Sequence, residues 1–236
     1  MISLATIIGH RGAAAQVAEN TLASFDRAAE LGATWIELDV RLTGDGKLAV
    51  FHDATLERTT NGRGRLDETD SHALCRLDAG GGEPVPLLDQ ALALARHRRL
   101  GVNIEIKGKP ESARQTATAL TEALTGHDEP ILISSFKAAF LTQTMVQLPH
   151  LPRGLLFKGL PADWQAQAQS LGAASIHCRN REITQGQVEA IKTEGYLCAI
   201  YTVNDPQRAE ILWSWGVDSV FSDLPPPMAA LLRNNR

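Results

Sequence analysis

Four apolar stretches of this chain end in residues that can carry chemistry. Their last positions are His10-Arg11, Glu37 with Asp39, His52-Asp53, and Glu105 with Lys107. A run of about four to six apolar residues that ends in titratable groups is typical of a buried strand whose end opens on a site. Together these ends offer two imidazoles, several carboxylates, a guanidinium and an ammonium, which suits metal-assisted chemistry on a phosphate.

The carboxylates predict a metal site. Glu37 and Asp39 are two residues apart on a predicted strand, so their side chains share one face. Two such carboxylates repel each other, and a divalent ion that prefers oxygen ligands, such as Mg²⁺ or Ca²⁺, resolves the repulsion. The alternative is that each carboxylate pairs with a nearby Arg or Lys. Glu105, from the next barrel strand, adds a third carboxylate and favours metal binding.

His10 and His52 are the acid–base candidates, because imidazole holds or releases a proton near neutral pH. A lone histidine at a strand end is more often a structural hydrogen-bonding group, but two that converge on a carboxylate cluster favour catalysis. Arg11 and Lys107 offer positive charge for a phosphate, Arg through a bidentate fork. The alternative is that they neutralise the same carboxylates, and both roles are compatible.

Apolar runs and helical patterns alternate along the chain. The predicted strands are 4–9, 34–40, 48–52, 101–106, 131–135, 153–157, 174–178, 197–203 and 218–222. The predicted helices are 20–31, 87–98, 111–125, 137–147, 161–171, 184–194 and 206–215. Asn20-Thr21 is the predicted cap of the first helix. Strands that alternate with helices of this length indicate a parallel sheet built from βα units.

Nine strands are one too many for an eight-stranded barrel, and the extra strand is 48–52. The connection 42–47 is shorter than the dozen or so residues that a parallel crossover needs, and Asp45-Gly46 is a hairpin turn signal. Segment 48–52 is therefore expected to run antiparallel to 34–42, which brings His52 beside Asp39. The other strands predict an α/β fold: a single (β/α)8 TIM barrel with an extra β-hairpin after strand 2. Segment 53–86 is predicted to be a long, functional or mobile connection, and the tail from residue 225 to hold a short closing helix at most.

Composition narrows the function classes. The chain has 236 residues, 44% of them hydrophobic, which fits one domain spanning 1–236. With 23 Lys and Arg against 27 Asp and Glu, the net charge of -4 argues against a nucleic-acid partner. Three cysteines give no disulfide framework, and no apolar run approaches the roughly 20 residues of a membrane helix. We expect a cytoplasmic protein without stable membrane association, of undetermined oligomeric state.

The ordered motifs resemble those of the glycerophosphodiester phosphodiesterase family, which shares the phosphatidylinositol-specific phospholipase C-like barrel. The matching motifs are His10-Arg11-Gly12, Glu19-Asn20-Thr21, Glu37-Leu38-Asp39, His52-Asp53, Thr59-Thr60-Asn61-Gly62, Glu105-Ile106-Lys107, Tyr201-Thr202-Val203-Asn204, Gly216-Val217-Asp218 and Phe221-Ser222-Asp223. Each motif is weak alone, but their order and spacing from residue 7 to about 225 are specific. The chain departs from the family pattern at Tyr201, where the family often has Trp, and lacks the usual proline within 13–18.

The resemblance implies a TIM barrel and a division of roles. Glu37, Asp39 and Glu105 would bind Mg²⁺ or Ca²⁺, His10 and His52 would be the general base and general acid, and Arg11 and Lys107 would hold the phosphate. The implied reaction cleaves a small-molecule glycerophosphodiester to sn-glycerol 3-phosphate and an alcohol. The head-group alcohol, the metal used in the cell, and the choice between direct water attack and a cyclic phosphate intermediate stay open.

Two other functions are alternatives to glycerophosphodiester hydrolysis. Lysophospholipase D or sphingomyelinase D-like activity on lipids would call for an apolar or basic rim for docking on a membrane, whereas 53–86 is polar and glycine-rich. A non-catalytic barrel would be expected to lose some ligand or imidazole positions, and all of them are present here. Both alternatives are therefore disfavoured.

Overall fold

Eight parallel strands close into a ring in the computed structural model, which describes residues 2–225. They are β1 (Ile7–His10), β2 (Trp35–Leu42), β4 (Gly101–Ile106), β5 (Ile131–Ser135), β6 (Arg153–Phe157), β7 (Ser175–Arg179), β8 (Leu197–Tyr201) and β9 (Ser219–Ser222). The ring closes because β1 pairs in parallel with both β2 and β9. The predicted TIM barrel is confirmed, whereas the predicted closing segment beyond residue 225 lies outside the described residues.

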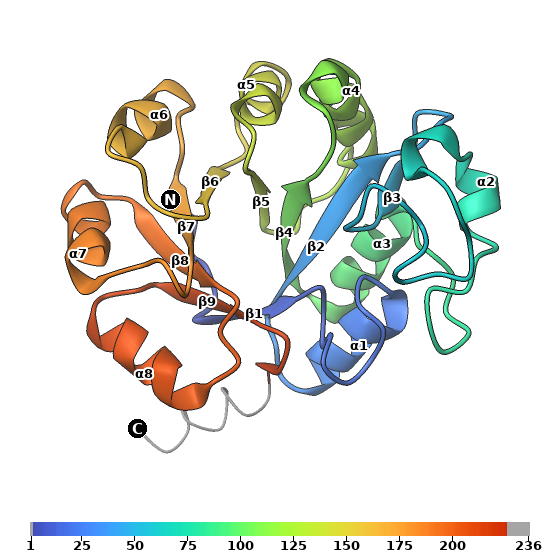
Figure 1. Ribbon diagram of the computed structural model, residues 1–236. Coiled ribbons are helices and arrows are strands. Elements are labelled where there is room, and N and C mark those ends of the chain that lie inside the picture. Colours follow the sequence, from blue (N-terminus) through green and yellow to red (C-terminus); the bar gives the residue numbers. More distant parts are fainter. Residues whose placement is uncertain (1, 226–236) are drawn as a thin grey trace.

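Helices surround this ring (Figure 1). The longer ones are α1 (Leu22–Glu30), α3 (Leu88–Arg98), α4 (Ala113–Ala123), α5 (Ala138–Gln147), α6 (Trp164–Ser170), α7 (Gln185–Thr193) and α8 (Pro206–Ser214). Thr21 caps α1 by accepting a hydrogen bond from the backbone N–H of Ser24, and Asp205 caps α8 through Gln207, with Pro206 in the first turn. Within residues 2–225, no helix is long and apolar enough to cross a membrane.

The extra strand β3 (Leu48–Val50) lies outside the ring and runs antiparallel to β2, as the short connection predicted. It ends two residues earlier than the predicted 48–52. The Phe51 N–H still donates to the Asp39 carbonyl at 2.9 Å, but the His52 carbonyl accepts from the Arg41 side chain at 2.8 Å. The return bond of this pair is missing, because the Asp39 N–H donates to Asn20 Oδ1 at 3.2 Å and not to the Phe51 carbonyl.

The segment after β3 is more structured than predicted. It contains a 3₁₀ turn, η1 (Leu66–Glu68), and the short helix α2 (Ser71–Leu74), and Figure 1 shows it packed outside β2 and β3. A separate apolar cluster supports it, formed by Ala49, Phe51, Leu56, Leu66, Leu74, Ala79 and Val85. Elements of three or four residues are too short to produce a helical periodicity, so the sequence indicated only a long connection.

Two apolar layers hold the barrel. Outward-facing strand residues such as Ile36, Leu38 and Val40 pack with the surrounding helices in the main core. A smaller cluster contains Ile8, Trp35, Leu132, Ala199 and Phe221. Gly101 is required there, because a Cβ at this position would lie 2.3 Å from the Trp35 ring. Apolar packing therefore fixes the strands whose carboxyl ends carry the polar groups described below.

Candidate active site

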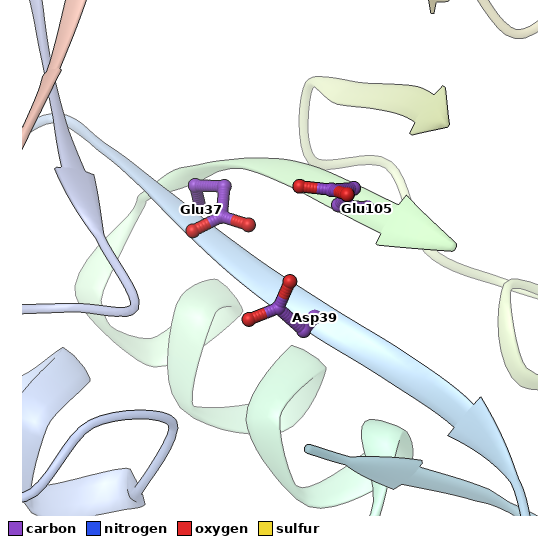
Figure 2. Close-up of side chains that lie close together, drawn as sticks. All are labelled: Glu37, Asp39 and Glu105. Atoms are coloured by element: carbon purple, nitrogen blue, oxygen red, sulfur yellow. The ribbon is translucent and has the colours of Figure 1, made fainter. Parts of the chain in front are cut away.

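Three buried carboxylates converge from two neighbouring strands. Glu37 and Asp39 lie on one face of β2, and the parallel register places Asp39 opposite Glu105 of β4. One oxygen of each carboxylate lies within 4.8 Å of the others, and the exposed fractions are 2%, 1% and 7%. Figure 2 shows the three carboxylates gathered over β2 and β4. The structure thus brings together the three residues that the sequence predicted as metal ligands.

Burial and mutual repulsion govern the charge of this cluster. Burial, reinforced by Asp39 and Glu105, raises the pKa of Glu37 well above its ordinary range. Burial likewise raises the pKa of Glu105 to about 7, although Lys107 opposes it. For Asp39, burial is outweighed by Lys107 and Arg11, which hold its pKa below the usual value. Burial therefore disfavours the charged forms of Glu37 and Glu105, whereas the neighbouring cations favour the charged form of Asp39.

Lys107 and Arg11 are the cations of the cluster. The Lys107 ammonium lies 3.2 Å from Asp39 Oδ1 and forms an ion pair with Glu105. Arg11 Nε lies 3.1 Å from Asp39 Oδ2, and its backbone N–H donates to Glu37 Oε2 at 3.0 Å. The alternative weighed from the sequence, that these cations neutralise the carboxylates, therefore describes their geometry here. A phosphate bound above the cluster would meet the same cations.

The donor set fits a hard divalent ion. Asp39 Oδ1 and Glu105 Oε1 both contact the Lys107 ammonium, so Glu37 Oε1 is the buried carboxylate oxygen of the cluster that lacks both a hydrogen bond and an ion pair within the described residues. Carboxylate oxygens of this kind are what Mg²⁺ and Ca²⁺ prefer, whereas a buried charged oxygen without a partner is costly. The cluster is therefore compatible with a divalent metal site.

His10 ends β1 beside this cluster and is held by a distant carboxylate. Its Nε2 lies 3.9 Å from Glu37 Oε2, and its Nδ1 lies 2.6 Å from Asp223 Oδ1. Asn204 fixes that carboxylate by donating to Asp223 Oδ2 at 2.7 Å and by accepting from the Asp223 N–H at 2.9 Å. With Nδ1 bonded to a carboxylate, Nε2 is the nitrogen left to exchange a proton at the cluster.

His52 has a matching arrangement on the other side. Its Nδ1 lies 2.5 Å from Asp53 Oδ1, and the Asp53 carboxylate also accepts from Arg58. The hydrogen bond from Arg58 lowers the pKa of Asp53 to about 2, so this partner stays charged. Burial lowers the pKa of His52, opposed mainly by Asp39. Both candidate imidazoles thus have a carboxylate on Nδ1 and flank the same acidic cluster.

Several contacts of the site were not foreseen as such. Asn20, predicted as a helix cap, instead donates to Asp39 Oδ2 at 2.9 Å and accepts from the Asp39 N–H at 3.2 Å, while Thr21 alone caps α1. Glu19 accepts from Arg11 at 2.7 Å and from both terminal nitrogens of Arg58. For Asn20, the sequence signal was its place in a motif of the family.

The backbone around Arg11 is as specialised as its side chain. Arg11 adopts the left-handed region at φ 53° and Gly12 follows at φ 87°. A Cβ on Gly12 would lie 2.4 Å from the Ser24 hydroxyl oxygen and 2.6 Å from the Ser24 backbone. The motif therefore needs glycine here, because the turn after β1 packs directly on α1.

The far side of the barrel end presents two aromatic rings. Phe136 is 37% exposed, and its ring stacks edge-on against Tyr201 with centroids 5.8 Å apart. The Tyr201 hydroxyl donates to the Phe157 carbonyl at 2.8 Å. Ser134, Ser135 and His177, near the ends of β5 and β7, are fully buried. His177 forms a 2.9 Å hydrogen bond with Ser175 inside the barrel, where the strand is still covered.

A TIM barrel with an acidic cluster and two imidazoles at its strand ends indicates an enzyme. Comparisons with known proteins identify its family. The model of the glycerophosphoryl diester phosphodiesterase family matches residues 10–226. A glycerophosphodiester phosphodiesterase of Caldanaerobacter subterraneus subsp. tengcongensis is 37% identical over 239 residues, covering 96% of this chain and 97% of the relative.

Solved structures agree with that match. A phosphodiesterase of Oleispira antarctica, in complex with the product sn-glycerol-3-phosphate, superimposes with a TM-score of 0.95 at 35% identity, covering 98% of this chain and 97% of that one. A glycerophosphodiester phosphodiesterase of Agrobacterium tumefaciens gives a TM-score of 0.79 at 30% identity over 96% and 100%. This chain belongs to the glycerophosphoryl diester phosphodiesterase family, which confirms the family and the enzyme class predicted from the motifs.

Proposed function

We propose that this protein hydrolyses glycerophosphodiesters to sn-glycerol 3-phosphate and an alcohol, with a divalent metal and two histidines. The observation that carries this proposal is the arrangement of His10 and His52, each with a carboxylate on Nδ1, around three converging carboxylates. Family membership supports the diester substrate, and the product complex of the Oleispira antarctica relative supports the glycerol phosphate product.

Glu37, Asp39 and Glu105 would hold the metal, Mg²⁺ or Ca²⁺. When bound, the ion neutralises charge on the phosphoryl oxygens as a Lewis acid. Arg11 and Lys107 add fixed positive charge beside the same oxygens, Arg11 through its planar fork. Because Glu19 and Asn20 anchor Arg11 and Asp39, the phosphate would meet groups that need no rearrangement.

The histidines would move the protons. In this mechanism His10 Nε2 takes the proton from the attacking oxygen, while Asp223 on Nδ1 stabilises the imidazolium that forms. His52 donates a proton to the oxygen of the departing alcohol, and Asp53 stabilises its protonated form. Direct attack by water and attack by the glycerol 2-hydroxyl require the same proton transfer to His10.

The wider cellular setting stays a sequence-based prediction. It consists of a single domain over 1–236, a cytoplasmic location, no nucleic-acid partner and no stable membrane association.

The experiment that tests the proposal is a turnover panel of water-soluble glycerophosphodiesters with Mg²⁺, Ca²⁺, Mn²⁺ or EDTA. We expect release of glycerol 3-phosphate that EDTA abolishes and a divalent ion restores, because the cluster then loses the cation that balances its carboxylates. Glu37→Gln and Asp39→Asn should raise the ion concentration for half-maximal activity. Full turnover in chelator would contradict the metal assignment, and no turnover of any diester would contradict the proposed function.

A further inference from the structure

A cavity lies beside the segment that carries His52. It has a volume of about 480 Å³ and lies between the β2–β3 hairpin, the η1 segment and the loops that follow β4 and β5. Its lining begins where the candidate active site ends: Ala54 follows the His52-Asp53 pair, and Gly108 follows Lys107. The seven site residues do not line the cavity themselves, but the segments that carry His52 and Lys107 do, so the cavity adjoins the candidate site on the His52 side.

The charge of the cavity is predominantly positive. Its ionisable lining residues are the cations Arg41, Arg65, Lys109 and Lys137 and the carboxylates Asp67 and Glu111. Asp67 is already shared, because it lies 2.5 Å from the Arg65 guanidinium and 3.3 Å from the Lys109 ammonium. The single carboxylate Asp67 thus serves two of the four cations.

Asp39, Asp53 and Asp67 offset part of the charge of Arg41 from a distance, but neither Arg41 nor Lys137 is paired directly. Arg41 Nε donates to the His52 carbonyl at 2.8 Å, and Lys137 Nζ donates to the Gly108 carbonyl at 2.5 Å. Within residues 2–225, neither forms an ion pair with a carboxylate. A neutral carbonyl holds each side chain in place without cancelling its charge. Each side chain has further N–H groups, and N–H donors on cationic side chains are the groups that bind phosphate in proteins.

We propose that this cavity binds a phosphate group carried by the departing alcohol, so that the preferred diester has a leaving group with its own negative charge. The inference rests on the proposed function, in which His52 protonates the leaving oxygen and the alcohol therefore lies on the His52 side. A phosphorylated three-carbon alcohol would reach from the cluster toward Arg41 and Lys137. A cationic alcohol such as choline or ethanolamine would meet like charge in the same place.

The first test compares two diesters that differ by one charge. Glycerophosphoglycerol has a neutral leaving alcohol, and the same diester with a terminal phosphate on that alcohol has an anionic one. We expect the phosphorylated diester to give a kcat/KM about tenfold higher at low salt, and Lys137→Gln to lower that preference about three- to tenfold. The matched control is Lys158→Gln, which removes the same charge after β6, outside the cavity, and should leave the preference intact.

A second test does not depend on turnover. Calorimetric titration in EDTA measures the binding of both diesters to the wild type and to each variant. Tighter binding of the phosphorylated diester, weakened by Lys137→Gln but not by Lys158→Gln, supports the inference. Equal affinities for the two diesters, or equal effects of the two variants, overturn it. Failure of the proposed function appears separately, as absence of turnover of both diesters with metal present.

Discussion

The two halves of the barrel end are built from different kinds of residue. The half formed by β1, β2, β4 and the segment after β3 carries all seven residues predicted for the site, as three carboxylates, two cations and two imidazoles. The half formed by β5 to β8, on the other side of the ring in Figure 1, presents Phe136 and Tyr201 and buries a neutral His177. The residues predicted for the site are thus concentrated on one side, whereas the other side adds two aromatic rings and, after β5, the charge of Lys137.

This difference shows how a folded chain tolerates buried charge. In the charged half, ionised side chains are linked into chains of ion pairs, such as Arg11 to Glu19 to Arg58 to Asp53. Isolated buried charges would be expensive, so each one is matched or, for the carboxylate cluster, left in need of a cation. In the other half, the buried His177 is uncharged and forms one hydrogen bond, with Ser175. The comparison predicts that substitutions of the residues around the carboxylate cluster affect catalysis and that substitution of the buried His177 affects stability.

The largest effects should come from the imidazoles. General acid–base catalysis contributes about 10²–10⁴-fold per group, so His10→Ala and His52→Ala should each lower kcat by that factor. Circular dichroism should show an unchanged fold, because both histidines lie at the barrel end. A variant whose rate stays within a few-fold of the wild type would make that histidine structural and would break the comparison.

The carboxylate partner of His10 should follow. Asp223→Asn removes the negative charge on His10 Nδ1, and hydrogen bonds to charged groups are worth about 1.5–3 kcal/mol, which corresponds to about 10- to 100-fold in kcat. We expect KM to change little and the pH–rate profile to shift, which a merely structural carboxylate would not cause. Asp223→Glu should recover part of the rate. Wild-type kcat with an unmoved pH profile would count against a positioning role.

The buried His177 should affect stability and its pH dependence, and not the catalytic rate. Burial lowers the pKa of His177 from 6.5 to about 3, so between these values the unfolded chain binds the proton more tightly. The free energy of unfolding is therefore at its full value above pH 6.5. As the pH falls below 6.5, it decreases by about 1.4 kcal/mol per pH unit. His177→Gln should reduce this dependence in urea unfolding between pH 7.5 and 5. If the free energy of unfolding changed equally with pH in the variant and the wild type, the lowered pKa of His177 would be wrong.

The smallest effect is expected for Arg11→Lys, which tests whether Arg11 binds phosphate or only balances neighbouring carboxylates. Arg11→Lys keeps the positive charge but loses the planar fork, so kcat/KM should fall about tenfold with little change in melting temperature. If Arg11 served only to balance Glu19 and Asp39, activity per folded molecule would stay near normal and the melting temperature would fall. Kinetics and thermal unfolding of the same preparation distinguish the two outcomes.

Much of the fold followed from local patterns. The short turn at Asp45-Gly46 was enough to place β3 outside the ring, and the predicted start of the last helix at residue 206 is correct. Errors occurred where tertiary contacts override local signals. The strand 48–52 ends early where the Asp39 N–H donates to Asn20 and not to the Phe51 carbonyl. Helix α2 was missed because four residues are too few to show a helical periodicity.

The sequence by itself determined which residue types end the strands, that Glu37 and Asp39 share a face, and that the family motifs occur in order. Those features depend on neighbours along the chain, and strand periodicity expresses them directly. Only the tertiary structure decided that Asp223 meets His10, 213 positions away, that His177 is covered, and that Arg41 and Lys137 line one cavity. These depend on how the ring closes, because register and closure, rather than spacing, set which strand ends adjoin.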